Sequence, residues 1–411
     1  MIMMITRNIA RYIISIVFIF SGFVKAIDPL GSTYKFSDYF EAFGIDFLIP
    51  LSLPFAIILS STELLIGLCL FFKIRMKLAA WALTVFMVFF TILTLIIAIT
   101  NPVTDCGCFG DAIILTNWQT FFKNLFFLIP TAIVFFERNR FRECCTVLTE
   151  WIITIASFGV ILILSFYCLA NLPLIDFRPY KIGANIQEGM EIPEGMPVDE
   201  YQTVLVYEKD GIQKDFTLDS PEEPWSDSTW TWVETKNILV SRGYEPPIHD
   251  FSLTSTDGEE ITDQVLTDQG YSFLIVAYDV KKSNKNALSQ LAKLMEMALD
   301  NNYKVYGMTA SVAEVVETET KPLDLPFEFY TTDDITLKTI IRSNPGLVLI
   351  KEGTIIAKWH YRNIPDDSFF SGQGLARSIE QIVQAKNRST SLTVVLFIGF
   401  IALLIFFFRR P

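Results

Sequence analysis

The sequence predicts an all-α membrane bundle of four helices, joined to an α/β extracytoplasmic domain and anchored by two further transmembrane helices. Three observations predict it: long apolar runs, basic clusters that fall on one side of the membrane, and a long acidic segment between the last two runs. Of the 411 residues, 51% are hydrophobic. They gather in runs of about 17–25, the length that an α-helix needs to cross about 30 Å of hydrocarbon. Because no water satisfies backbone polar groups there, such runs form helices.

Six runs qualify as spans: about Asn8–Ile27, Pro50–Phe72, Lys77–Ile99, Trp118–Phe136, Trp151–Asn171 and Leu392–Phe408. The first four, within residues 1–136, make the predicted bundle, and residues 151–171 and 392–408 are the two anchors. Lys123 and Asn124 interrupt the fourth run. A signal peptide is the alternative for the first run, but the run is long and no clear cleavage site of small residues follows it.

Basic residues predict the orientation, because cytoplasmic loops carry an excess of Lys and Arg. Four clusters stand beside the runs: Arg7 with Arg11, Lys73 with Arg75 and Lys77, Arg138 with Arg140 and Arg142, and Arg409 with Arg410. All four fall on the cytoplasmic side if both termini are cytoplasmic. The loop between Ile99 and Trp118, which has no Lys or Arg, then faces outward. We therefore expect a multi-pass protein of the cell inner membrane with its large domain in the periplasm.

The long segment between the fifth and sixth runs, about Leu172–Ser391, is polar and acidic. Its 20 basic and 35 acidic residues give it a net charge of −15. Such a charge argues against nucleic acid and anionic lipid headgroups as its partners, and favours a basic protein partner or client outside the cytoplasm. Membrane lipid surrounds the apolar runs. The segment has no cysteine, so it is not a disulfide scaffold. With two histidines in the chain, no metal site is expected.

The acidic segment divides into two parts. Residues 172–244 favour strands at Thr203–Tyr207 and Lys214–Leu218, followed by a loop at Pro221–Trp232. Within residues 245–388 the pattern becomes a buried strand, a helix, a second strand and a hairpin: Phe273–Tyr278, Asn286–Leu299, Lys304–Met308, and Leu347–Ile350 with Ile355–Trp359. That order predicts an α/β sandwich.

The strongest candidate for chemistry is Cys106-Gly107-Cys108, in the outward loop after the third run. One intervening glycine lets the chain turn tightly enough to bring two sulfurs together. A disulfide across so short a loop is strained and therefore easily reduced. Asp105 and Asp111 oppose this chemistry, because nearby carboxylates raise the pKa of a thiol. A pinned loop or a pair of inert thiols is the structural alternative.

Redox turnover at these two cysteines needs a route for electrons. Cys144 and Cys145 are expected on the cytoplasmic side, about 30 Å away across the bilayer. Cys69 and Cys168 are solitary and suit contacts between helices. No cysteine relay therefore crosses the membrane. The acceptor is then a quinone-like molecule or a protein outside the membrane, although no cofactor site is evident in the sequence.

Glu63 lies inside the second run, where a carboxylate is costly and marks a functional candidate. A proton or substrate role competes with a structural one, in which Glu63 is protonated or bonds Ser21 or a backbone carbonyl. We expect Lys25, at the end of the first run, to reach the interface rather than to pair with Glu63. Gly22 and Gly67 favour close helix packing.

Three segments together resemble the DoxX-like / MauE-like membrane proteins over about the first third of the chain: Phe20–Lys25 (FSGFVK), Glu63 with Gly67, and Cys106–Gly110 (CGCFG). The resemblance implies a four-helix membrane domain associated with periplasmic redox chemistry. In methylamine utilisation, MauE is linked to the maturation of methylamine dehydrogenase, whose small subunit is rich in disulfides. The large acidic segment departs from the short members of this family.

Residues 247–361 are similar to thioredoxin-like domains of the peroxiredoxin/TlpA type. The opening Pro247–Leu253 with Asp257-Gly258 resembles theirs, and Pro345 matches the position of their cis-proline. Where that family carries Cys-x-x-Cys after its strand, this chain has Tyr278-Asp279-Val280-Lys281. No thiolate can form there, so we expect this domain to bind a partner rather than to exchange disulfides.

Two functions from different classes follow from these features. The first is a membrane component of extracytoplasmic thiol–disulfide redox chemistry or disulfide-dependent protein maturation. It would act as a thiol–disulfide oxidoreductase through Cys106 and Cys108, with Glu63 as a further candidate. The alternative is a non-enzymatic scaffold or assembly factor whose acidic thioredoxin-like domain binds a partner protein. A transporter that uses Glu63 is a weaker third hypothesis, because the bundle has one buried charge and no repeat.

Overall fold

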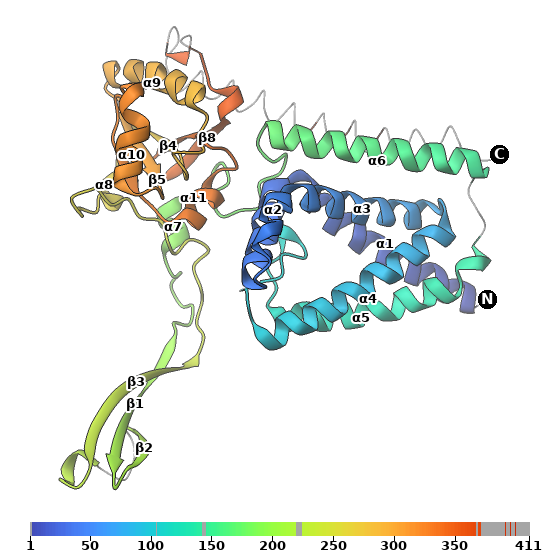
Figure 1. The fold of residues 1–411 in the computed structure, drawn as a ribbon, viewed down its shortest axis with the longest axis horizontal. Helices are drawn as coiled ribbons and strands as arrows, with labels where there is room; N and C mark the ends of the chain where they lie inside the picture. Colours follow the sequence, from blue (N-terminus) through green and yellow to red (C-terminus); the bar gives the residue numbers. More distant parts are fainter. Residues whose placement is uncertain are drawn as a thin grey trace.

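The computed structural model describes residues 2–370 except 104, 142–144, 219–223, 367 and 368, and beyond them the single positions 391, 395 and 399. A bundle of long helices lies beside an α/β domain, from which a three-stranded sheet projects (Figure 1). Cys144 and, apart from two single positions, the expected span Leu392–Phe408 lie outside the described residues.

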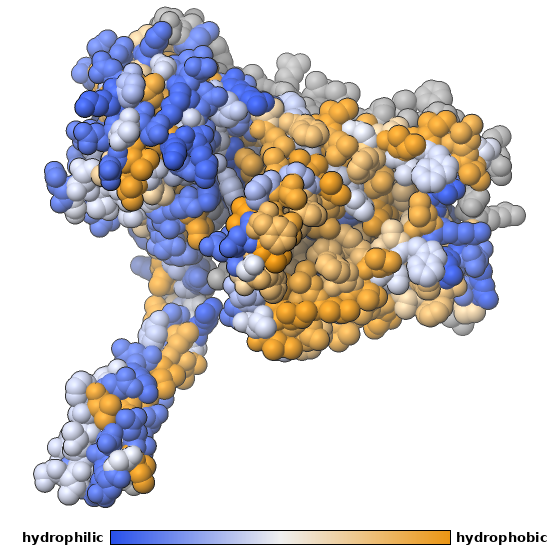
Figure 2. Space-filling view, viewed as in Figure 1, coloured by the Kyte–Doolittle hydropathy of each residue, from blue (hydrophilic) through white to orange (hydrophobic). Residues whose placement is uncertain are grey.

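Among the described residues, five helices are long and apolar enough to cross a membrane. They are α1 (Ile2–Ile27), α3 (Ser52–Phe72, preceded by the 3₁₀ turn Asp46–Leu51), α4 (Met76–Thr100), α5 (Asn117–Phe136) and α6 (Val147–Ala170). Each matches one of the first five predicted runs, so the prediction of a membrane protein is confirmed. Apolar surface covers these helices, whereas the α/β domain is polar (Figure 2).

Polar residues inside α5 do not interrupt it, because the bundle pairs them. Asn124 is buried and its Nδ2 donates to Thr94 Oγ1 of α4 at 3.2 Å. The Lys123 ammonium lies 4.4 Å from the centre of the Phe109 ring.

Helices α1 and α3 approach to backbone contact at two glycines. A Cβ atom at Gly22 would lie 2.4 Å from the backbone nitrogen of Leu64, and one at Gly67 would lie 2.7 Å from that of Ile19. Any larger residue would push the helices apart. The predicted close packing at Gly22 and Gly67 is therefore confirmed.

The two ends of the bundle differ in chemistry. At one end, Arg11 is buried and its Nη1 donates to the last carbonyls of α3, Leu70 O at 2.7 Å and Phe71 O at 2.5 Å. Arg7 pairs there with Glu137 at 3.8 Å. We call this the arginine end. The loop between α4 and α5, residues 101–116, lies at the opposite end, which we call the cysteine end (Figure 1).

A helix that the sequence analysis did not predict, α2 (Pro29–Ala42), covers the cysteine end (Figure 1). Asp28 caps it, with Oδ1 accepting from Gly31 N at 3.0 Å. Pro29 occupies the first helical turn, where its missing N–H leaves no bond unmade. One residue separates α1 from α2, so the chain turns sharply across the end of the bundle.

The α/β domain contains a five-stranded sheet in the order β6-β5-β4-β7-β8. Its strands are β4 (Tyr271–Val276), β5 (Lys304–Thr309), β6 (Phe329–Thr331), β7 (Gly346–Lys351) and β8 (Thr354–His360). The first three are parallel and the last two antiparallel to their neighbours. Its helices are α7 (Ile186–Met190), α8 (Thr262–Leu266), α9 (Lys285–Asp300), α10 (Ala313–Thr320) and α11 (Asp334–Ile340). The predicted strand, helix, strand and hairpin are all present in that order, and the unpredicted elements α10, β6 and α11 lie between β5 and the hairpin.

Both faces of this sheet are buried. Phe273 and Ile275 pack with Leu291 of α9 on one face. Leu274 and Val276 pack on the other face with α11 and with residues that follow α6: Tyr180 and Ile186. The peptide bond before Pro345 is cis, as the thioredoxin-like resemblance implies.

A small antiparallel sheet projects from the α/β domain in the order β2-β1-β3 (Figure 1). It consists of β1 (Glu200–Lys209), β2 (Ile212–Thr217) and β3 (Thr231–Ser241). The first two match predicted strands. The third was not predicted: it begins within the expected loop Pro221–Trp232, and all its residues are exposed, so it lacks the alternating burial that marks a strand in sequence.

Candidate functional site

The loop between α4 and α5 folds back over the bundle instead of extending away from it. Asn101 ends α4 with φ of 46°. Asn117 holds the start of the loop, because its Nδ2 donates to Asn101 Oδ1 at 2.8 Å and to Val103 O at 2.7 Å. Thr116 and Gln119 form a capping box that begins α5. Both ends of the loop are therefore fixed to the helices.

Cys106 and Cys108 lie side by side in this loop as free thiols, with their Sγ atoms 3.2 Å apart. Gly107 permits this arrangement, because its φ of 63° lies in the left-handed region that glycine adopts without steric cost. The two sulfurs therefore lie close together, as the sequence predicts.

Hydrogen bonds from α1 and α2 hold the cysteine backbone. Ser21 Oγ donates to Cys108 O at 2.6 Å, and Tyr39 Oη donates to Cys106 O at 2.9 Å. Ser21 precedes the end of α1 by six residues, which at a rise of 1.5 Å per residue is about 9 Å. The cysteine backbone thus lies beside α1, below its end, and beneath α2.

The carboxylates that flank the cysteines are each paired with a cation. Lys35 Nζ lies 2.6 Å from Asp105 Oδ2, and Arg342 Nη2 lies 2.8 Å from Asp111 Oδ2. The pairing weakens the effect that these carboxylates were expected to have on the thiols.

The two thiols share one hydrogen bond, and it moves their pKa values apart. The hydrogen bond from Cys106 lowers the pKa of Cys108 to about 6, against the effect of burial and with the help of Lys123 and Lys25. The hydrogen bond with Cys108 and burial raise the pKa of Cys106 well above its ordinary value. The shared hydrogen bond therefore favours ionisation of Cys108 over that of Cys106. The predicted rise in thiol pKa applies to Cys106, but its main cause is the neighbouring thiol.

Lys25 of α1 and Glu63 of α3 form an ion pair, with side-chain exposures of 11% and 6%. This corrects two expectations: Lys25 does not reach away from Glu63, and Ser21 bonds the cysteine loop instead of Glu63. The physical reason is that an unpaired charge among apolar side chains costs far more than a paired one. The close approach of α1 and α3 at Gly22 places the two side chains next to each other.

A cavity of about 510 Å³ lies beneath the loop, and both cysteines line it. Five helices contribute to its wall, largely through apolar and aromatic side chains such as Phe36, Phe55, Phe89, Phe90 and Phe127. Lys25, Glu63 and Lys123 also line it, and all three act electrostatically on Cys108. The cavity therefore has a polar end at the cysteines and apolar walls elsewhere.

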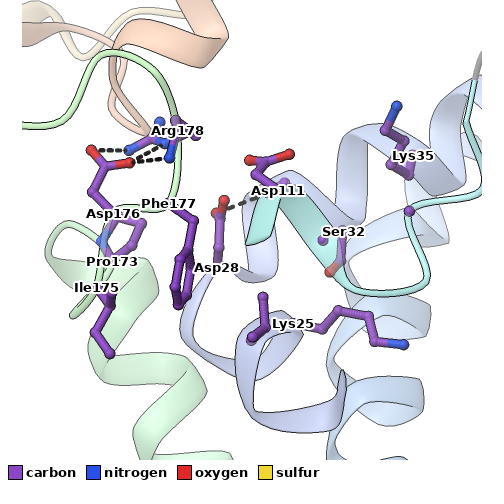
Figure 3. A pocket seen from close by; sticks show the side chains of 14 residues that line it. Lys25, Asp28, Ser32, Lys35, Asp111, Pro173, Ile175, Asp176, Phe177 and Arg178 are labelled. Atoms are coloured by element: carbon purple, nitrogen blue, oxygen red, sulfur yellow. Dashed lines mark hydrogen bonds and ion pairs between the residues drawn. The ribbon is translucent and has the colours of Figure 1, made fainter. Parts of the chain in front are cut away.

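The α/β domain contacts the other side of this loop. Arg342, which is buried, lies between Asp28 and Asp111. Figure 3 shows these two carboxylates close together, facing the segment after α6 that holds the Asp176–Arg178 pair. A cavity of about 30 Å³ separates that segment from the loop.

Helix α2 lies between the cysteines and the α/β domain. The Oη atom of Tyr278, which stands where the thioredoxin-like family carries its first cysteine, lies 3.4 Å from Tyr34 Oη of α2. Lys35 and Tyr39 of α2 contact the cysteine loop. The end of β4 is therefore a contact surface against α2.

The three predicted site residues, Cys106, Cys108 and Glu63, line one cavity. The sequence analysis missed Tyr39 and treated Lys123 as an interruption of a helix. A single charge within an apolar run is itself a signal for a functional position, so Lys123 was identifiable. Among the described residues, no group of three or more His, Cys, Asp or Glu is placed to hold a metal ion.

Comparison with known proteins gives limited matches. No curated protein matches the chain. Residues 201–242, which include most of β1–β3, match a domain of unknown function, DUF8463.

Similar solved structures include a candidate protein disulfide isomerase from Bacteroides thetaiotaomicron, at 19% identity over 33% of this chain and 84% of that one, with a TM-score of 0.24. Others are an uncharacterised conserved protein from Geobacillus kaustophilus (12% identity, 32% and 79% of the chains, TM-score 0.25) and a hypothetical protein from Sinorhizobium meliloti 1021 (14% identity, 34% and 81%, TM-score 0.25). In the N-terminal third, residues 3–137 match the family model described as methylamine utilisation protein MauE, which confirms the resemblance of this region.

Proposed function

We propose that this protein is a thiol–disulfide oxidoreductase that oxidises exported proteins at the periplasmic face of the cell inner membrane. The observation that carries the proposal is the contact of two free thiols at 3.2 Å, Cys106 with Cys108, in a loop fixed at both ends. The low pKa of Cys108 adds a thiolate to this arrangement. Proximity of a thiolate and a thiol is what disulfide exchange requires.

The difference in pKa assigns the two cysteines different roles. When a client thiolate attacks the Cys106–Cys108 disulfide, the sulfur with the lower pKa leaves faster. Cys108 is that sulfur, so the client forms its mixed disulfide with Cys106. A second client thiolate then attacks this bond and releases Cys106. The client gains a disulfide, and Cys106 and Cys108 are left as a dithiol.

Glu63 is proposed to accept and release protons during this cycle. It lines the same cavity as both cysteines and is paired with Lys25. Lys25 and Glu63 therefore both face the space into which a thiol releases its proton. In this proposal Glu63 accepts the proton that a cysteine thiol releases and later gives it up within the cavity.

In the proposed topology, α1, α3, α4 and α5 form the four-helix membrane domain, and α6 and the segment near Leu392–Phe408 are anchors. The basic residues at the arginine end support a cytoplasmic location for that end. Both termini are then cytoplasmic, and the cysteine end and the α/β domain are periplasmic. The name of the MauE family refers to methylamine utilisation. For this chain we propose a role in the maturation of an exported protein, and we propose no amine substrate.

An alkylation gel shift on native membranes tests the proposal. Membranes are treated with or without reductant and then with a thiol reagent of high mass. We expect wild-type protein to shift by two additional reagents after reduction, and the Cys106→Ser/Cys108→Ser variant not to respond. A mixed disulfide with a client should accumulate in Cys108→Ser and not in Cys106→Ser. A cysteine pair that keeps one state under all conditions excludes the proposal.

A scaffold without enzymatic activity is the second candidate. The observation that favours it is the contact of the thioredoxin-like domain with α2 through Tyr278, made by a domain that has no cysteine. A scaffold would keep its cellular function in Cys106→Ser/Cys108→Ser and lose it when residues 247–361 are deleted. The oxidoreductase would lose its function with the double serine substitution.

A further inference from the structure

We infer that the cavity beneath the cysteine loop binds a lipid-soluble quinone, which restores the Cys106–Cys108 disulfide. The inference rests on the proposed thiol–disulfide function, because a protein that oxidises its clients must be oxidised again after each turnover. It adds the oxidant, its binding site and the direction from which it arrives.

The other described cysteines do not offer a path for these electrons. Cys69 and Cys168 are buried within α3 and α6 as free thiols. Cys145 belongs to the buried cluster at the arginine end. Exchange between thiols requires direct contact of sulfurs. The oxidant must therefore come to Cys106 and Cys108, and the cavity is the space that both of them line.

The size and lining of the cavity suit an aromatic ring with an apolar tail. Its volume of about 510 Å³ lies within the roughly 300–1,000 Å³ of small-molecule sites. Aromatic side chains from α2–α5, among them Phe36, Phe55 and Phe90, offer ring faces for stacking. The two ammonium groups near the cysteines, Lys25 and Lys123, are donors for the carbonyl oxygens of a quinone.

The mouth of the cavity lies on the surface of the helices. Three of its lining residues are among the exposed apolar side chains of α3 and α4: Phe55 at 42%, Ile58 at 57% and Phe89 at 59%. In a membrane these residues face lipid. On the opposite side, α2 and the loop itself cover the sulfurs. An oxidant dissolved in lipid can therefore reach the cavity sideways, whereas a protein client cannot use this route.

The reaction balances without any further reagent. The S–H bond of Cys106 breaks, the Cys108 thiolate has already released its proton, and one S–S bond forms between the two sulfurs. The two electrons and two protons pass to the quinone, which becomes a hydroquinone. The Lys25–Glu63 ion pair lines the same cavity and is placed to carry these protons.

The test uses the full chain in lipid nanodiscs of phosphatidylcholine, freed of native quinone and reduced. The probes are decylubiquinone for oxidation, a photoreactive azido-quinone for binding, and diamide as a water-soluble oxidant. Ile58→Trp fills the mouth of the cavity. Ile92→Trp is the matched control, because Ile92 is equally exposed at 57% but does not line the cavity.

We expect decylubiquinone to oxidise wild type and Ile92→Trp at equal rates. It should oxidise Ile58→Trp at least about tenfold more slowly. A tenfold difference corresponds to a loss of about 1.4 kcal/mol in quinone binding. The azido-quinone should label α3 or α4 in the first two and not in Ile58→Trp. Diamide should oxidise all three equally, which shows that the Ile58→Trp thiols are intact.

Every other outcome rejects either the quinone site or the proposed thiol–disulfide function. Oxidation by diamide but not by decylubiquinone, or equal quinone rates in all three proteins, rejects the quinone site and leaves the thiol chemistry standing. Labelling by the azido-quinone without oxidation identifies an apolar lipid site without a redox role and also rejects it. Thiols that respond to no oxidant reject the proposed function itself.

Discussion

Arg342 of the α/β domain reaches into the membrane domain, where its Nε lies 3.0 Å from Asp28 Oδ2, the residue that caps α2. Its Nη2 atom bonds Asp111 of the cysteine loop. One buried guanidinium thereby connects the α/β domain to both elements around the cysteines. The domain has no cysteines of its own, yet it contacts both the cap of α2 and the cysteine loop.

The Arg342→Gln substitution should expose the cysteines. Removal of one partner of a buried ion pair costs about 3 kcal/mol, and the two carboxylates left behind repel each other. We expect α2 to separate from the loop more often, and a membrane-impermeant maleimide to label Cys106 and Cys108 about tenfold faster. Arg362→Gln is the control, because Arg362 is exposed and bonds Tyr361 of its own domain. Equal labelling rates in both variants would contradict the role of Arg342.

The reactivity of Cys108 should change at an unusually low pH. Its lowered pKa, about 6, means that the thiolate is populated above pH 6, whereas an ordinary thiol ionises near pH 8.5. The rate of alkylation by iodoacetamide should therefore rise between about pH 5 and pH 7 and then level off. Peptide mass spectrometry assigns the rate to each cysteine. An alkylation rate of Cys108 that rises only above pH 8 would show that Cys108 is not the thiolate.

Loss of Lys25 should destabilise the bundle, and loss of Glu63 at the same time should restore much of the stability. Lys25→Met removes one partner of a buried ion pair, which costs about 3–5 kcal/mol. Lys25→Met/Glu63→Gln removes both charges. Thermal unfolding in detergent should show a large decrease in Tm for the single variant and a small one for the double variant. Equal decreases in Tm would indicate that the two side chains act independently.

The contact of α1 with α3 should not tolerate even one methyl group. An alanine Cβ at Gly22 would lie 2.4 Å from Leu64 N, and overpacking of this kind costs about 1–3 kcal/mol. Gly22→Ala should therefore reduce the amount of folded protein recovered from membranes. Gly159→Ala in α6 is the matched control, since no atom lies within 4 Å of its added Cβ. A yield for Gly22→Ala equal to that of the control would refute the close packing.

The long helices and the order of the α/β strands were predictable, because both follow from local patterns. The length of an apolar run fixes a membrane helix, and the buried strands around Phe273 and Leu347 are continuous apolar stretches. Helix α2 was missed although its signals were present: Asp28 is a capping residue and Pro29 a common first residue of a helix. Its mixed polar and aromatic composition resembles that of a loop, so the segment was not identified as a helix.

The contacts between distant parts of the chain were not predictable from one sequence. Lys25 and Glu63 are 38 positions apart, and their pairing depends on the backbone approach at Gly22. Arg342 and Asp28 are 314 positions apart. No periodicity in either segment encodes the docking of one domain on another. The cysteine pair was predictable because two residues in one short loop must lie close together.

The central claim is that Cys106 and Cys108 interconvert as a pair between dithiol and disulfide. An equilibrium titration of the purified full chain against mixtures of reduced and oxidised glutathione, quenched by alkylation and read by mass spectrometry, tests it directly. We expect both residues to lose reactivity together in one two-electron transition, while Cys69 and Cys168 stay reduced. Two cysteines that stay alkylatable in every mixture, or that titrate separately, would contradict the claim.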